Sequence, residues 1–145
     1  MTKRKVRLGH CHRCIYTWRM RRQYPRICPR CKSRLWKVPK IRPVVLGNGA
    51  GIEEVLGPHR SEILWIARKY GVTRVRVFGS VRRREAGEKS DVDLIVTWSA
   101  PHSILDRAAL TAQIERIVGR AVDVVNEGGL HWAIAPQVEA EAIPL

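Results

Sequence analysis

The feature that most constrains the fold of this 145-residue chain is the placement of its four cysteines. They form two pairs, C-H-R-C and C-P-R-C, separated by thirteen residues. Each pair offers two thiolates from one tight turn, so the pattern predicts a single structural zinc ion held by Cys11, Cys14, Cys28 and Cys31. A segment this short buries too little surface to fold alone, and the metal would supply the missing stability. The alternatives are two disulfides or free thiols, and disulfides are less favoured because no secretion signal is recognisable.

Charge divides the chain into two parts. Residues 1–43 contain 15 Lys and Arg and no acidic residue, whereas residues 44–145 contain 12 Lys and Arg and 13 Asp and Glu, a net charge of −1. We interpret residues 1–43 as a basic zinc ribbon, residues 44–57 as a linker and residues 58–145 as a second domain. The basic ribbon is expected to attract a polyanion, and its charge leaves DNA, RNA and an acidic protein surface open as partners.

Two tryptophans of the basic ribbon, Trp18 and Trp36, lie in short β-favouring stretches among arginines. We expect them to form most of the small core of the ribbon, and stacking on nucleic-acid bases is the alternative. His10 and His12 flank the first cysteine pair and are expected at the surface, because the cysteines already complete a ligand set.

Composition places the protein among soluble globular chains. Apolar residues make up 45% of it, which is enough for a packed core. Every apolar stretch is far shorter than the ~20 residues that a membrane span requires. We therefore expect a cytoplasmic protein with no membrane partner.

Helical and strand patterns alternate after the linker. Helices are expected over residues 58–70, from the capping box at residues 103–106 onward, and over residues 132–142. Strands are expected over residues 72–78, 91–98 and 121–126. The order of these segments indicates an α/β (α+β) domain with a small mixed sheet and flanking helices.

Candidate catalytic residues lie at the ends of the expected strands. Gly79-Ser80 follows the first strand directly, and ten residues separate it from Asp91-Val92-Asp93. Residues two apart in a strand share a face, so Asp91 and Asp93 present neighbouring carboxylates that divalent cations would stabilise. Asp123 is an isolated carboxylate in an apolar strand, which indicates that it meets the other two.

The segment from Gly79 to Val96, with its Gly-Ser, its ten-residue spacing, its Asp-x-Asp-Leu and the later Val-Asp-Val, resembles the nucleotidyltransferase superfamily of DNA polymerase beta. The resemblance covers about residues 58–145 and is specific to the minimal nucleotidyltransferase (MNT) branch. It implies that Gly79, Ser80 and Arg83 bind the nucleoside triphosphate. It also implies that Asp91 and Asp93 hold two magnesium ions, with Asp123 as the third carboxylate. Arg82 and Arg84 replace residues that are usually small in this branch. We expect both in solvent, and a wider contact with phosphate is the alternative.

The resemblance also implies a partner. MNT proteins typically pair with a helical HEPN ribonuclease in toxin–antitoxin modules, in which the MNT protein adenylylates and silences the toxin. The implied function is magnesium-dependent transfer of AMP from ATP to a HEPN protein. The basic ribbon is not part of the usual minimal form, and two alternatives stay open. One is a nucleotidyltransferase acting on RNA or a small molecule, and the other is a non-catalytic nucleic-acid-binding protein.

Overall fold

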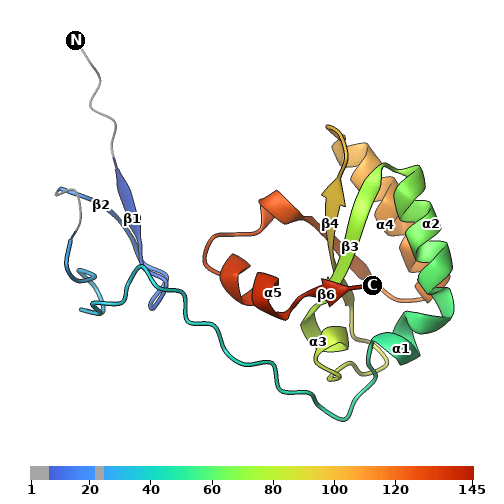
Figure 1. Cartoon of the computed structure of the whole chain (residues 1–145), viewed down its shortest axis with the longest axis horizontal. Helices are drawn as coiled ribbons and strands as arrows, with labels where there is room; N and C mark the ends of the chain where they lie inside the picture. The colour runs from blue at the N-terminus through green and yellow to red at the C-terminus, as the bar shows by residue number, and fades with distance from the viewer. Residues whose placement is uncertain (1–6, 22–24) are drawn as a thin grey trace.

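The computed structural model describes residues 7–21 and 25–145. Within this part of the chain, a small cysteine-rich module is joined by an extended segment to an α/β module (Figure 1). None of the helices in the described ranges is long and apolar enough to cross a bilayer.

The cysteine-rich module is built on one short antiparallel hairpin. Strand β1 (Leu8–His10) pairs with β2 (Thr17–Arg19), and Gly9 lies opposite Trp18. A Cβ at Gly9 would lie 2.7 Å from the Trp18 indole, so a residue without a side chain is required there. Trp36 is only 5% exposed and packs with Cys11 and Cys28, as expected for a core residue. Trp18 is half-buried and packs against the same cluster.

The second module begins with helical segments and enters its sheet at β3. The elements are α1 (Ile52–Val55), the 3₁₀ turn η1 (Gly57–His59), α2 (Arg60–Lys69), β3 (Val72–Phe78) and α3 (Gly79–Arg82). They are followed by β4 (Val92–Trp98), α4 (Ile104–Val118), β5 (Val122–Asn126), the 3₁₀ turn η2 (Glu127–Gly129), α5 (Ala135–Glu141) and β6 (Ile143–Pro144).

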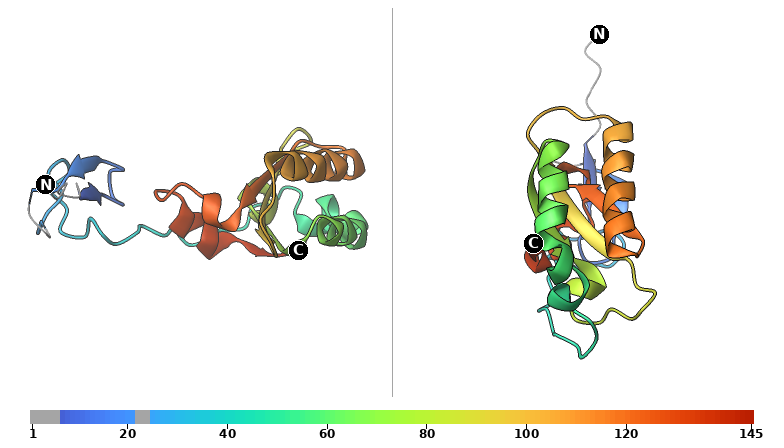
Figure 2. Two further views of the ribbon diagram at one scale, coloured as in Figure 1. Left: turned by 90° about the horizontal axis from the view of Figure 1, so that it is seen from above. Right: turned by 90° about the vertical axis from the view of Figure 1, so that its right-hand side faces the viewer.

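The sheet of the second module is mixed, with the strand order β5-β4-β3-β6. β3 pairs antiparallel with both β4 and β6, and β4 pairs in parallel with β5. The expected small mixed sheet with flanking helices is therefore confirmed. Figure 2 shows α2 and α4 side by side on one face of the sheet, with α5 beyond the other face.

Strand alternation sends apolar side chains toward α2 and α4. Val92, Leu94 and Val96 of β4 are fully buried and pack with Val75 and Val77 of β3 in the main core. The residues between them face the opposite side of the sheet, where they are polar more often. Asp93 therefore lies on the face of the sheet opposite α2 and α4.

Helix α4 begins as its sequence predicts. Ser103 accepts a hydrogen bond from the Asp106 amide at 3.1 Å, and the Asp106 carboxylate accepts one from the Ser103 amide at 2.8 Å. Both bonds of the capping box are thus present. The helix ends at Gly119, whose φ of 69° is left-handed.

The segment interpreted as a linker contributes to the core of the second module. Val55 is 7% exposed and Leu56 is fully buried, and both pack in the main core. The Gly47 and Gly49 amides donate hydrogen bonds to the carbonyls of Arg83 and Arg84. We therefore propose that the second module begins near Gly47 rather than at residue 58.

The two modules contact each other through aromatic side chains. Trp132, in the loop between η2 and α5, lies with its ring centroid 4.7 Å from that of His10 and 5.3 Å from that of His12. The extended segment is also tied to α5, because the Arg42 amide donates to Gln137 Oε1 at 2.6 Å. The contact places the basic ribbon beside the loop that follows β5.

Candidate active site and metal centre

Strand register places two of the three predicted catalytic carboxylates side by side. Asp93 of β4 lies directly beside Asp123 of β5 in the parallel pair, and beside Phe78 of β3 in the antiparallel pair. Asp91 immediately precedes β4 and is exposed. Asp93 and Asp123 therefore lie side by side next to Gly79, which follows Phe78 in the chain, whereas in the described residues the three aspartates do not come close enough together to form a group that could share one ion.

The charges of the neighbouring aspartates act on Asp93. Burial raises the pKa of Asp93, and the charges of Asp123 and Asp91 raise it further, while the Arg83 guanidinium acts in the opposite direction. A carboxylate that is both partly buried and surrounded by like charge is costly to ionise unless a cation neutralises it. The donor set of oxygen ligands suits magnesium.

Gly79 is packed against Asp93. Its φ is 71°, in the left-handed region, and an added Cβ would lie 2.8 Å from Asp93 Cγ. A side chain at this position would thus be strained and would displace the carboxylate. Glycine here lets the backbone approach the Asp93 carboxylate closely.

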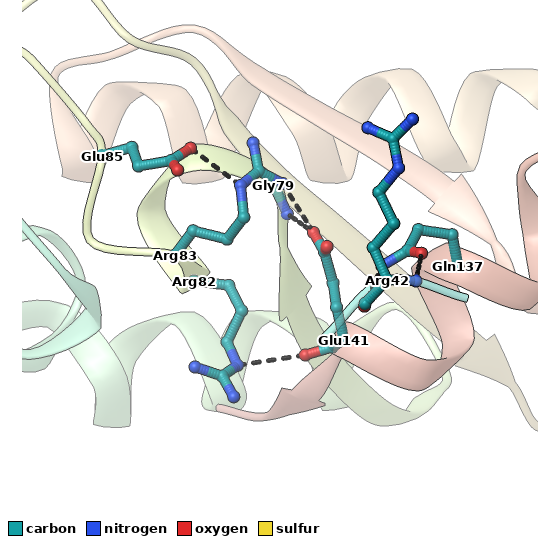
Figure 3. A network of polar contacts seen from close by, with 7 residues as sticks. All are labelled: Arg42, Gly79, Arg82, Arg83, Glu85, Gln137 and Glu141. Carbon is teal, nitrogen blue, oxygen red and sulfur yellow. Dashed lines mark hydrogen bonds and ion pairs between the residues drawn. The ribbon is translucent and has the colours of Figure 1, made fainter. Parts of the chain in front are cut away.

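Glu141 is a central residue of the site that the sequence analysis missed. It lies at the end of α5, is only 4% exposed, and its Oε1 accepts from the Gly79 amide at 2.7 Å and from Arg83 Nη1 at 2.9 Å (Figure 3). Glu139, two residues earlier, is exposed. No local pattern separates these two glutamates, because the contacts of Glu141 are made across about 60 residues of sequence.

The arginines after Gly79-Ser80 have partners of their own. Arg83, the predicted phosphate ligand, pairs with both Glu141 and Glu85, whose Oε2 lies 2.8 Å from Arg83 Nε. Arg82 Nε donates to the Glu141 carbonyl at 3.0 Å, as Figure 3 shows. Arg84 Nη2 lies 2.8 Å from Glu54 Oε1, in a pair whose side chains are about half exposed. Arg84 is exposed, as expected, whereas Arg82 is half-buried, and each one also ties the turn to another element.

A second acidic residue that was not expected from the sequence, Glu127, lies on the same face of the sheet as Asp93. Glu127 accepts hydrogen bonds from Arg76 at 2.8 Å and from the Thr97 hydroxyl at 2.6 Å. The Thr97 hydrogen bond and the nearby arginines lower the pKa of Glu127, and burial opposes them weakly. This network joins β3, β4 and the end of β5 beyond the three aspartates, so it fixes the strands that carry them.

The four cysteines converge as the spacing predicts. Their sulfur atoms all lie within 4.8 Å of one another, and within the described ranges they are the one group of potential ligands close enough to share a single ion. The Cys11–Cys31 and Cys14–Cys28 sulfur pairs are 3.7 and 3.8 Å apart, and the thiols are free. Zinc–sulfur bonds of about 2.3 Å in a tetrahedron separate the sulfurs by about 3.8 Å. The geometry thus fits a Cys₄ metal site.

The environments of the thiols differ. Burial raises the pKa of Cys11 to about 12. Burial also acts to raise the pKa of Cys28, but hydrogen bonds from the Cys31 and Arg30 amides outweigh it and lower the value to about 7. Amide donors aimed at a sulfur are the outer contacts expected around a thiolate ligand.

Comparison with known proteins identifies the class of the second module. The nucleotidyltransferase domain family matches residues 61–145, more than half of the chain. The chain therefore belongs to this family and is a nucleotidyltransferase.

Several relatives are more specific. The protein adenylyltransferase MntA of Thermococcus cleftensis is 36% identical over 92 residues, covering 63% of this chain and 90% of that protein. A candidate protein adenylyltransferase of Methanocaldococcus jannaschii is 33% identical over 84 residues, 58% of this chain and 90% of that protein. A solved candidate minimal nucleotidyltransferase is 42% identical with a TM-score of 0.59, covering 68% of this chain and all of that one. These relatives confirm the resemblance to the minimal branch.

A crystal structure of a toxin–antitoxin pair with AMP-PNP shares the fold at a TM-score of 0.53 and 18% identity, covering 59% of this chain and 71% of that one. At this identity the likeness concerns the fold alone.

Proposed function

We propose that this nucleotidyltransferase is a magnesium-dependent protein adenylyltransferase, which transfers AMP from ATP to a HEPN partner and acts as its antitoxin. The observation that carries the proposal is the register of β3, β4 and β5, which sets Asp93 beside both Asp123 and the Gly79-Ser80 turn. The names of the relatives support the choice of a protein as the acceptor.

In this proposal Asp91, Asp93 and Asp123 hold the magnesium ions. The raised pKa of Asp93 supports it, because the three like charges favour the binding of cations. Bound there, two ions would neutralise phosphate charge and lower the pKa of the acceptor hydroxyl.

The remaining roles belong to side chains and backbone of the turn. Gly79 and Ser80 bind the triphosphate, and the acceptor oxygen attacks the α-phosphorus as the bond to the bridging oxygen breaks and pyrophosphate leaves with the electron pair. Asp123 would help to hold the metal ion that activates the acceptor hydroxyl for attack. Arg83 is engaged with two carboxylates through Nε and Nη1, and the other N–H groups of its guanidinium would be the donors to phosphate.

The position of a radioactive label tests this function. The protein, magnesium and a HEPN protein encoded next to it would be incubated with ATP labelled either on the α- or on the γ-phosphate. Adenylylation predicts label on the HEPN protein from α-labelled ATP alone, and loss of its ribonuclease activity. Labelling of RNA in a total extract instead would favour the RNA-directed alternative, and label from the γ-phosphate would contradict nucleotidyl transfer.

We also infer that Cys11, Cys14, Cys28 and Cys31 bind one zinc ion and that the basic ribbon binds nucleic acid. The sulfur–sulfur distances support the first inference. The second is supported by 15 basic residues without an acidic one in residues 1–43. Binding through phosphates predicts an affinity that falls steeply between about 50 and 200 mM salt.

A further inference from the structure

A groove with a volume of about 560 Å³ lies on the basic ribbon, far from the three aspartates in sequence. Its apolar lining includes Tyr16, Trp18, Ile27 and Pro29. Ile27 is 40% exposed and Tyr16 is 37% exposed. Apolar and aromatic surface is therefore open to solvent in a module whose hydrophobic core is small.

The aromatic residues of the groove pack against the core of the basic ribbon. The Tyr16 and Trp18 rings are nearly parallel, with an angle of 11° between their planes and 6.0 Å between their centroids. Trp18 in turn packs edge-on against the buried Trp36, with 5.1 Å between centroids, and Trp36 Nε1 donates to the Pro25 carbonyl at 3.0 Å. The cysteine core therefore orients Trp18, and through it Tyr16, which stays 37% exposed.

Positive charge surrounds these rings. Arg19 and Arg21 line the groove, and the Arg30 guanidinium lies over the Tyr16 ring, 5.6 Å from its centroid. Throughout residues 7–21 and 25–43, no arginine forms an ion pair with a carboxylate. The groove thus combines flat aromatic surface with cations that have no acidic partner.

This combination is complementary to an unpaired nucleotide. A base offers a flat face for stacking and the adjoining phosphates offer negative charge, whereas a duplex hides its base faces. We propose that the groove binds single-stranded nucleic acid, with unpaired bases stacking against Tyr16 and Trp18 and with Arg19 and Arg21 on the adjacent phosphates. The inference rests on the proposed binding of nucleic acid by the basic ribbon and is independent of the catalytic proposal.

Fluorescence anisotropy of the full zinc-loaded chain tests this site. The probes are a short labelled single-stranded RNA, a single-stranded DNA of the same sequence and the corresponding DNA duplex, each at low and at high salt. Tyr16→Leu keeps the apolar surface but removes the aromatic face, and we expect it to weaken single-strand binding about 5- to 30-fold with an unchanged salt dependence. Replacing Arg19 and Arg21 by Gln should weaken binding and also reduce the salt dependence.

Trp65→Ala is the matched control, since this exposed tryptophan on α2 lies in the other module, and its binding should equal that of the unmodified chain. Zinc content and circular dichroism show that each variant is folded. A Tyr16→Leu chain that is folded and binds single strands normally would contradict the proposal that the groove is the binding site. The proposal that the basic ribbon binds nucleic acid would be unaffected. A duplex bound as tightly as the single strands would also contradict the groove as the binding site, and no binding of any probe would remove the underlying proposal as well.

Discussion

Gly79 has a left-handed backbone conformation and lies against the proposed metal ligand Asp93. Replacing it by Ala should lower stability by about 1–3 kcal/mol, because the left-handed φ of 71° is strained for any other residue. It should also abolish nucleotide transfer, because the new Cβ would collide with the Asp93 carboxylate. Thermal unfolding and a transfer assay measure the two effects.

Gly128→Ala is the control for this substitution. No atom lies within 4 Å of the position that its Cβ would take, and its backbone is outside the left-handed region. Stability and transfer should both stay near those of the unmodified chain. A Gly79→Ala chain as active as this control would show that the turn does not need to approach Asp93.

Asp93 has a raised pKa, which means that its charge destabilises the metal-free fold. Asp93→Asn should therefore raise the free energy of unfolding at neutral pH in the presence of a chelator, and should abolish transfer when magnesium is present. Chemical denaturation across a range of pH, with and without magnesium, measures both consequences.

The sign of the pH dependence follows from the same shift. A carboxyl group whose pKa is higher in the folded state than in the unfolded state lowers the free energy of unfolding at neutral pH, where it is ionised. This destabilisation is lost as the pH falls through the pKa of the folded state toward that of the unfolded state. The advantage of Asp93→Asn over the unmodified chain should thus disappear in acid. Equal stability of the two chains at neutral pH without metal would contradict the crowding of the three carboxylates.

At the scale of elements, Glu141 links the end of α5 to the turn that begins α3. Glu141→Gln keeps the shape but weakens the charge-assisted contacts to Arg83 and the Gly79 amide. We expect a loss of about 1–3 kcal/mol, moderate because the Arg83 side chain is 34% exposed. The turn should also bind ATP less tightly, since it loses its brace.

Glu139→Gln provides the comparison on the same helix, because Glu139 is exposed. Its unfolding temperature and its KM for ATP should match those of the unmodified chain. If Glu141→Gln behaves like Glu139→Gln in both measurements, then Glu141 does not hold the turn.

Elements with strong local signals could be predicted from the sequence, and those held by distant contacts could not. β3 matches its predicted range, and α4 begins at its predicted capping box, because alternation and capping are properties of adjacent residues. α1 was overlooked within the presumed linker, and β6 has only two residues, too few to show a period. In the site, Asp91 and Asp93 were proposed from their spacing and Asp123 from its place in an apolar strand, whereas Glu141 is tied to the turn only by tertiary contacts.

At the scale of the whole molecule, the metal and the main core stabilise different modules. Cys28→Ser should reduce the zinc content and loosen the basic ribbon, because Cys28 is buried at the centre of its small core. The second module should stay folded, since its core contains none of the cysteines. Elemental analysis and hydrogen exchange of each module check these outcomes.

Arg34→Ala is a suitable control for this experiment, because Arg34 is exposed and close to the cysteines in sequence. It should retain one zinc ion per chain and normal protection in both modules. A full zinc content in Cys28→Ser would exclude the four-cysteine ligand set.

We propose that Asp91 and Asp93, together with Asp123, hold the cations for nucleotidyl transfer. Magnesium-dependent transfer of label from α-labelled ATP should be measured for the unmodified chain and for the double variant Asp91→Asn, Asp93→Asn, with the HEPN partner present. We expect transfer by the unmodified chain and none by the variant, which should still be folded and at least as stable without metal. Transfer that survives the double substitution would show that these carboxylates do not hold the cations.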